Sequence, residues 1–106
     1  MQFIRRFALP FLLVALCAAP LLGGCAGMPL QEMSDARQAI RAAERAGAEK
    51  HAPELLGEAR GLVETARESM HKGEYRTARD DAELARNKAM EARRVSEAAQ
   101  TAPGSP

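Results

Sequence analysis

The chain contains few aromatic side chains. Its 106 residues include no tryptophan, one tyrosine and three phenylalanines. Phe3, Phe7 and Phe11 all lie near the N-terminus, so Tyr75 is the single aromatic residue of everything that follows. Aromatic side chains dominate sugar, cofactor and hot-spot contacts. Their scarcity argues against a deep ligand pocket.

Cysteine is also scarce, and neither positive nor negative charge is in large excess. Only Cys17 and Cys25 are present, so a chain that loses its first residues keeps a single thiol and forms no internal disulfide. Without Arg5 and Arg6, 13 basic residues face 14 acidic ones. Nucleic-acid binding needs an uncompensated basic patch, so we expect no nucleic-acid partner.

The N-terminus has the three parts of a secretory signal. Arg5 and Arg6 supply a positive start, residues 7–22 are largely apolar, and small residues follow. Pro10 and Pro20 interrupt the apolar run. A membrane-spanning helix wants about 20 unbroken apolar residues, so we expect this segment to be a cleaved leader and not a span.

The residues before Cys25 resemble a lipobox. Leu22, Gly23 and Gly24 would be recognised by the signal peptidase, residues 1–24 would be removed, and Cys25 would receive a diacylglycerol group and a fatty acid. No other cofactor is expected. By the same resemblance Ala26 lacks the aspartate associated with inner-membrane retention, so we expect a lipid-anchored protein on the periplasmic face of the outer membrane.

Two other interpretations of the leader stay open. Cleavage near Ala18 and Ala19 would leave Cys25 as an ordinary secreted thiol, although Pro20 makes that cut unfavourable. Arg5 and Arg6 followed by an aromatic residue also resemble a twin-arginine export signal.

Turn and capping residues predict an all-α domain over residues 34–99, preceded by a tether at 25–33 and followed by a disordered tail at 100–106. Three helices are expected, the first with Ser34 as its N-cap: Ser34 to about Ala46, Pro53 to about His71, and Glu74 to about Ala99. Gly47 and Gly73 would end the first two helices.

The apolar spacing predicts how these helices meet. The third helix carries residues spaced by three and four, as in a coiled-coil seam: Tyr75, Ala78, Ala82, Ala85, Ala89 and Ala92. The second carries a wider face: Leu55, Ala59, Leu62, Ala66 and Met70, with Leu56 and Val63 beside them. We therefore expect an antiparallel helical hairpin or a small three-helix bundle with an alanine-rich seam, in which the wide-faced second helix is central.

Two resemblances follow from these patterns. Residues 72–78, KGEYRTA, resemble the turn and second helix of a tetratricopeptide repeat. A single unit forms no array, which favours a plain helical hairpin. Residues 48–56, AEKHAPELL, together with that turn resemble an uncharacterised family of small alanine-rich envelope lipoproteins, some of which are joined to an OmpA-like peptidoglycan-binding domain. The sequence shows no such domain, so the resemblance by itself does not predict whether this chain touches peptidoglycan.

No constellation of catalytic residues is apparent. His51 and His71 lie at opposite ends of the second helical region, so we predict no metal site. Asp80, Asp81 and Glu83 point in different directions on a helix and predict a solvated face. No serine has a nearby base, and we predict that the chain is not an enzyme.

One pair of apolar residues falls outside the seam. Leu84 and Val95 are eleven residues apart and stack along one line of the third helix, where they form a candidate partner surface or scattered surface residues. We expect an envelope interaction or spacing module whose partner is an envelope protein or a second copy of the chain. The alternative is a periplasmic ligand-binding or chaperone-like module.

Overall fold

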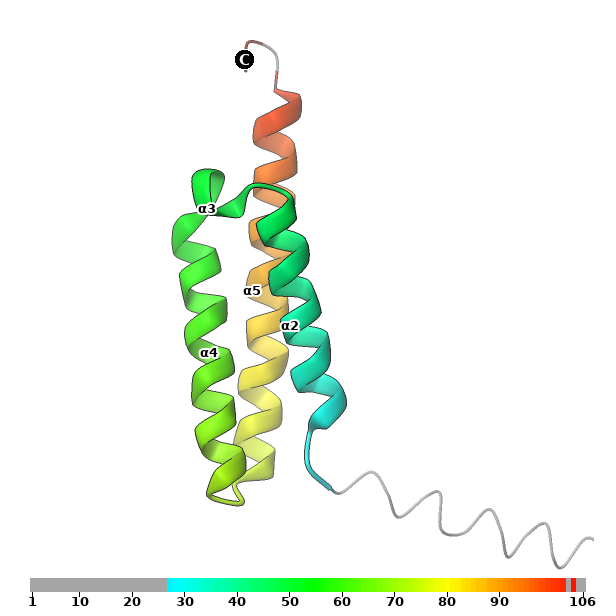
Figure 1. Ribbon diagram of the computed structural model, residues 1–106, viewed down its shortest axis with the longest axis vertical. Coiled ribbons are helices and arrows are strands. Elements are labelled where there is room, and N and C mark those ends of the chain that lie inside the picture. The colour runs from blue at the N-terminus through cyan, green and yellow to red at the C-terminus, as the bar shows by residue number, and fades with distance from the viewer. Residues whose placement is uncertain (1–26, 103, 105–106) are drawn as a thin grey trace, which may run out of the picture.

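The computed structural model describes residues 27–102 and 104, and within them it contains helices and no strand. The elements are α2 (Leu30–Arg45), α3 (Ala48–His51), α4 (Pro53–His71) and α5 (Tyr75–Thr101). Three long helices run side by side in Figure 1, and α3 caps one end. The predicted all-α bundle is confirmed. Leu22, Gly23, Gly24 and Cys25 lie outside the described residues.

The first long helix begins earlier than expected. It starts at Leu30 with Pro29 at its N-cap, so Ser34 is not the cap, and the predicted tether is helical from Leu30 onward. The reason is that the apolar period extends one turn upstream, because Met33 is buried in line with the other core residues of α2. The last helix likewise continues to Thr101, into the predicted tail.

Glycines end the helices where the sequence predicts. Gly47 and Gly73 have φ values of 87° and 76°, a region that L side chains rarely adopt. After α4, the Gly73 N–H donates to the Met70 carbonyl and the Glu74 N–H to the Ser69 carbonyl, which is the Schellman pattern. Pro53 occupies the first turn of α4, as expected.

The central helix is α5 and not α4, which corrects the sequence interpretation. Helix α5 packs along α4 and along α2, whereas α2 and α4 touch each other much less. The cause is the small alanine side chains of α5, which allow both α2 and α4 to pack close to the axis of this helix. Its buried residues are all small: Ala78, Ala82, Ala85, Ala89, Ala92 and Ser96.

The other expected seam residues are distributed unevenly. On α4, Ala59 and Ala66 are fully buried, while Leu55 and Leu62 are only half-buried and pack at the edge of the core. Leu56 and Val63, which the sequence placed at the side, lie closer to its centre. Tyr75 is half-buried at the start of α5 and lies outside the core cluster, so it does not anchor the seam.

Candidate functional site

The chain enters the bundle through a fixed point on α5. The Arg79 guanidinium donates to the carbonyl of Gly27 over 3.2 Å and to the Glu32 carboxylate over 3.3 Å. Arg79 therefore joins the first described residue and the first turn of α2 to α5. The start of α2 lies at the same end of the bundle as the α4–α5 turn (Figure 1).

A cavity of about 250 Å³ lies at that end, between the start of α2 and the end of α4. We call its lining the foot: Met28, Leu30, Met33, Arg37, Arg67, Met70 and His71. Leu30 is 63% exposed and Met28 is 49% exposed, whereas Met33 is buried. The foot thus presents apolar side chains to solvent around a recess. Methionine adapts its shape readily to irregular contacts.

The foot is bordered by positive charge. Arg37 makes no ion pair within the part of the chain that the structure describes, and Arg67 reaches Glu64 over 3.6 Å between two well-exposed side chains. Exposed ion pairs of this kind contribute little. Arg37 can therefore meet an anion directly, and Arg67 can do so by giving up its weak pair with Glu64.

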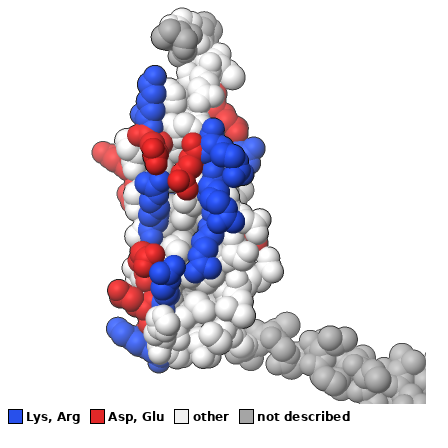
Figure 2. Space-filling model, in the orientation of Figure 1, with Lys and Arg blue, Asp and Glu red and all other residues white. Residues whose placement is uncertain are grey.

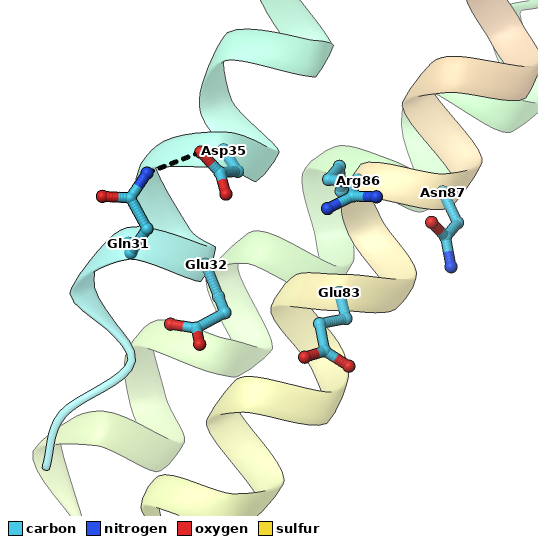
Figure 3. Close-up of a pocket in the computed structure, with 6 residues that line it drawn as sticks. All are labelled: Gln31, Glu32, Asp35, Glu83, Arg86 and Asn87. Carbon is cyan, nitrogen blue, oxygen red and sulfur yellow. Dashed lines mark hydrogen bonds between the residues drawn. The ribbon is translucent and has the colours of Figure 1, made fainter. Parts of the chain in front are cut away.

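A second recess, of about 330 Å³, lies between α2 and α5 and is polar. Figure 3 shows its six lining residues, three from each helix: Gln31, Glu32, Asp35, Glu83, Arg86 and Asn87. The Gln31 amide donates to Asp35 over 2.8 Å, and Glu32 is already paired with Arg79. The lining holds neither a histidine nor a hydroxyl nucleophile.

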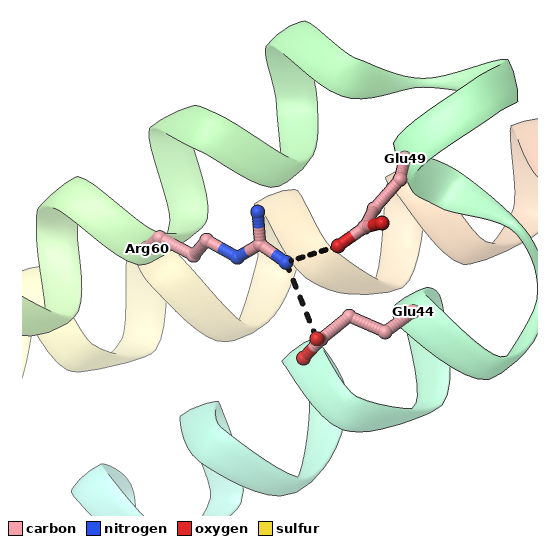
Figure 4. A network of polar contacts seen from close by, with 3 residues as sticks. All are labelled: Glu44, Glu49 and Arg60. Carbon is pink, nitrogen blue, oxygen red and sulfur yellow. Dashed lines mark hydrogen bonds and ion pairs between the residues drawn. The ribbon is translucent and has the colours of Figure 1, made fainter.

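The opposite end of the bundle is closed by a charged cluster. Arg60 of α4 contacts Glu44 of α2 at 3.2 Å and Glu49 of α3 at 3.0 Å (Figure 4). The hydrogen bond with Glu49 is the largest cause that raises the pKa of Arg60 above its ordinary value. This cluster joins three helices. It has the arrangement of a structural tie and holds no group poised for chemistry.

The two residues of the candidate partner surface are exposed. Leu84 is 45% exposed and Val95 is 39% exposed. Lys88 lies between them on the same line of α5 and pairs with Glu58 of α4 at 3.2 Å. The pair therefore borders the α4–α5 seam, and an ion pair separates its two members.

The histidines are far apart. His51 belongs to α3 at one end, and His71 lies in the foot at the other. Within residues 27–102 and 104, no cluster of three or more His, Cys, Asp or Glu is arranged to hold a metal ion. In the same part of the chain, no helix combines the length and apolar character that crossing a bilayer requires.

Residues 31–102 match the family described as Domain of unknown function (DUF4398). The chain belongs to this family. No curated protein and no solved structure matches it. The DUF4398 domain covers all three long helices almost from end to end, so the family corresponds to the bundle as a whole.

The foot of this DUF4398 domain is not evident from the sequence alone. Gly27 and Pro29, in a segment without an evident apolar period, predict a tether over residues 25–33. The available signal was Met33, which continues the apolar spacing of Ala36 and Ile40 back into the predicted tether.

Proposed function

We propose that the protein is a bacterial lipoprotein, anchored through acylated Cys25 in the outer membrane, whose DUF4398 domain acts as a non-catalytic interaction or spacing module in the envelope. The observation that carries the proposal is the lipobox-like LLGGC, whose cysteine stands two residues before the first described residue of the bundle. An anchor on Cys25 would fix a rigid bundle directly to the bilayer.

The structure supports a spacing role by its shape and by its surface. At 1.5 Å per residue, the 27-residue α5 is about 40 Å long, and the other two long helices lie against it. The core of the described part is made mostly of alanine, so the helices pack closely along their length. Such a module is suited to holding or presenting a partner, either an envelope protein or a second copy of itself.

The anchor is tested by fatty-acid labelling in a bacterial host. The wild-type chain should incorporate an alkyne fatty acid and lose residues 1–24, as measured by mass spectrometry of the membrane fraction. Cys25→Ser should abolish the label. Cys17→Ser is the matched control, because Cys17 lies in the expected leader and its loss should leave acylation intact. Label that persists in Cys25→Ser would reject the lipoprotein assignment.

The interaction role is tested by cross-linking intact cells that produce the acylated protein. A discrete envelope partner, lost with Cys25→Ser, would support an anchored adaptor. A product containing only this chain would support a self-associating spacer. Absence of any cross-linked product would contradict an interaction role and leave spacing by the bundle alone.

The second candidate is a periplasmic ligand-binding or chaperone-like module. The polar recess between α2 and α5 favours it, since Arg86 and three carboxylates converge there. It predicts that a polar ligand raises the melting temperature of the purified protein in a saturable way. Arg86→Ala should remove that rise, and a flat response across small polar ligands would eliminate this candidate.

A further inference from the structure

We propose that the foot of the bundle is a membrane-docking surface that seats on anionic phospholipid headgroups. This inference rests on the proposed anchor at Cys25 and goes beyond it, because it assigns a second contact with the bilayer and an orientation to the domain.

The first argument is the reach of the chain. Cys25 and Gly27 are two residues apart, so their Cα atoms are separated by at most about 7 Å. Gly27 is itself held to α5 through Arg79, and Glu32 is held by the same guanidinium. A lipid on Cys25 would therefore hold the bilayer surface close to the end of the bundle that carries the foot.

The second argument is what the foot exposes. Single exposed apolar residues are ordinary on protein surfaces. Here Met28 and Leu30, the two most exposed residues of the foot's apolar set, stand in one lining with Met33 and Met70 around a recess of about 250 Å³. Apolar side chains beside a bilayer gain by entering the boundary between headgroups and acyl chains.

The third argument is charge complementarity. Arg37 and Arg67 flank the apolar side chains, and Arg37 has no ion-pair partner within the described residues. Glu32, the carboxylate nearest in sequence to Leu30, is engaged by Arg79. Figure 2 shows Lys and Arg side chains over α2 and α4, interspersed with Asp and Glu on the α4 side, and uncharged surface beside them at the lower end of the bundle. Anionic lipid headgroups attract arginine side chains that lie close to the membrane surface.

Docking at the foot sets the orientation of the domain. The helices would rise from the membrane, and α3 with the Arg60 cluster would stand at the distal end. The line of Leu84 and Val95 would then run up the side of the bundle, where a partner can reach it.

The test uses the absence of tryptophan from this chain. A single indole is introduced by Leu30→Trp in the foot or by Val95→Trp on α5, both at exposed positions. Each protein is anchored to vesicles through Cys25, by natural acylation or by a maleimide lipid on that thiol. The anchor is thus supplied whether or not cells acylate Cys25.

In vesicles of phosphatidylglycerol and phosphatidylcholine, brominated lipid should quench roughly half of the Leu30→Trp emission and shift it to the blue, because indoles settle at the bilayer interface. The Val95→Trp emission should stay within the variation between samples. Adding Arg37→Glu and Arg67→Glu to Leu30→Trp should abolish the quenching while flotation of the anchored protein is unchanged. Vesicles of phosphatidylcholine alone should give much weaker quenching.

Three results would overturn the proposal. If the Leu30→Trp emission shows no more quenching by brominated lipid and no more blue shift than the Val95→Trp emission, the foot stays in water. A blue shift of the Leu30→Trp emission that grows with protein density but is insensitive to brominated lipid would assign the foot to contact between copies. Quenching that survives Arg37→Glu with Arg67→Glu would show that anionic headgroups are not recognised.

Discussion

The two ends of the bundle are built with different chemistry. At the end that carries α3, Arg60 bridges Glu44 and Glu49, and the Gln100 amide donates to the Ala46 carbonyl over 2.6 Å. At the foot, Met28 and Leu30 extend apolar side chains into solvent. Polar bonds join helices at both ends, through Arg60 at the distal end and Arg79 near the foot, but the foot also leaves apolar side chains exposed.

This difference separates stability from interaction. At the distal end, ion pairs and a hydrogen bond connect helices that are distant in the sequence, and the exposed ion pairs each contribute modestly to stability. Exposed apolar side chains add little to folding, because they remain in water in the folded state. Met28 and Leu30 therefore expose apolar surface that contributes little to folding, as the proposed docking surface requires.

The largest effect that sharpens this comparison is expected from one glycine at each end. Gly47→Ala and Gly73→Ala both force alanine into a left-handed conformation, at a cost of about 1–2 kcal/mol. A Cβ at Gly47 would also lie 3.0 Å from the Gln100 amide nitrogen, whereas a Cβ at Gly73 would meet nothing within 4 Å. Urea denaturation should therefore show a larger loss for Gly47→Ala.

A double substitution tests whether the additional loss of stability in Gly47→Ala comes from the contact with Gln100. In a Gln100→Ala background, the cost of Gly47→Ala should fall to that of Gly73→Ala. Equal losses for the two single substitutions would mean that the contact with Gln100 contributes nothing to closing the distal end.

A smaller effect is expected from the charged cluster. Arg60→Met keeps a long side chain but removes both ion pairs, so the melting temperature should fall in low salt. The fall should shrink toward zero at 1 M salt, where the Debye length is about 3 Å. Arg41→Met is the matched control, since Arg41 is an exposed arginine with no ion pair in the described part of the chain. If the melting temperatures of the two variants depend on salt in the same way, the Arg60 cluster does not stabilise the contact between helices.

Much of this fold was predictable because short-range rules decide it. Pro53, Gly47 and Gly73 set helix boundaries through backbone conformation alone, and the alanines of α5 repeat with a regular spacing. The order of packing was not predictable in the same way. A wide apolar face on α4 suggested a central helix, but close packing on two sides requires small residues, and these belong to α5.

The candidate site was less predictable than the fold. The foot joins the start of α2 to the end of α4, and no local pattern connects Leu30 with Met70 across forty residues of sequence. The sequence also offers two candidates for the N-cap of α2, Pro29 and Ser34, and the usual capping preference favours serine. Burial of Met33 decides the outcome, which is a tertiary effect. Leu84 and Val95, in contrast, were found by spacing and are exposed as that spacing suggested.

The smallest effect on stability is expected at the foot, and it separates the two ends most sharply. Leu30 is 63% exposed, so Leu30→Ser should change the free energy of unfolding by no more than about 0.5 kcal/mol. Ile40→Ser serves as the contrast, because Ile40 is buried in the same helix. This substitution should lower the free energy of unfolding several times more. Both are measured by urea denaturation of the same chain. A loss at Leu30 comparable to that at Ile40 would mean that the foot is part of the folded core, and the division between a stabilising distal end and an interacting foot would then fail.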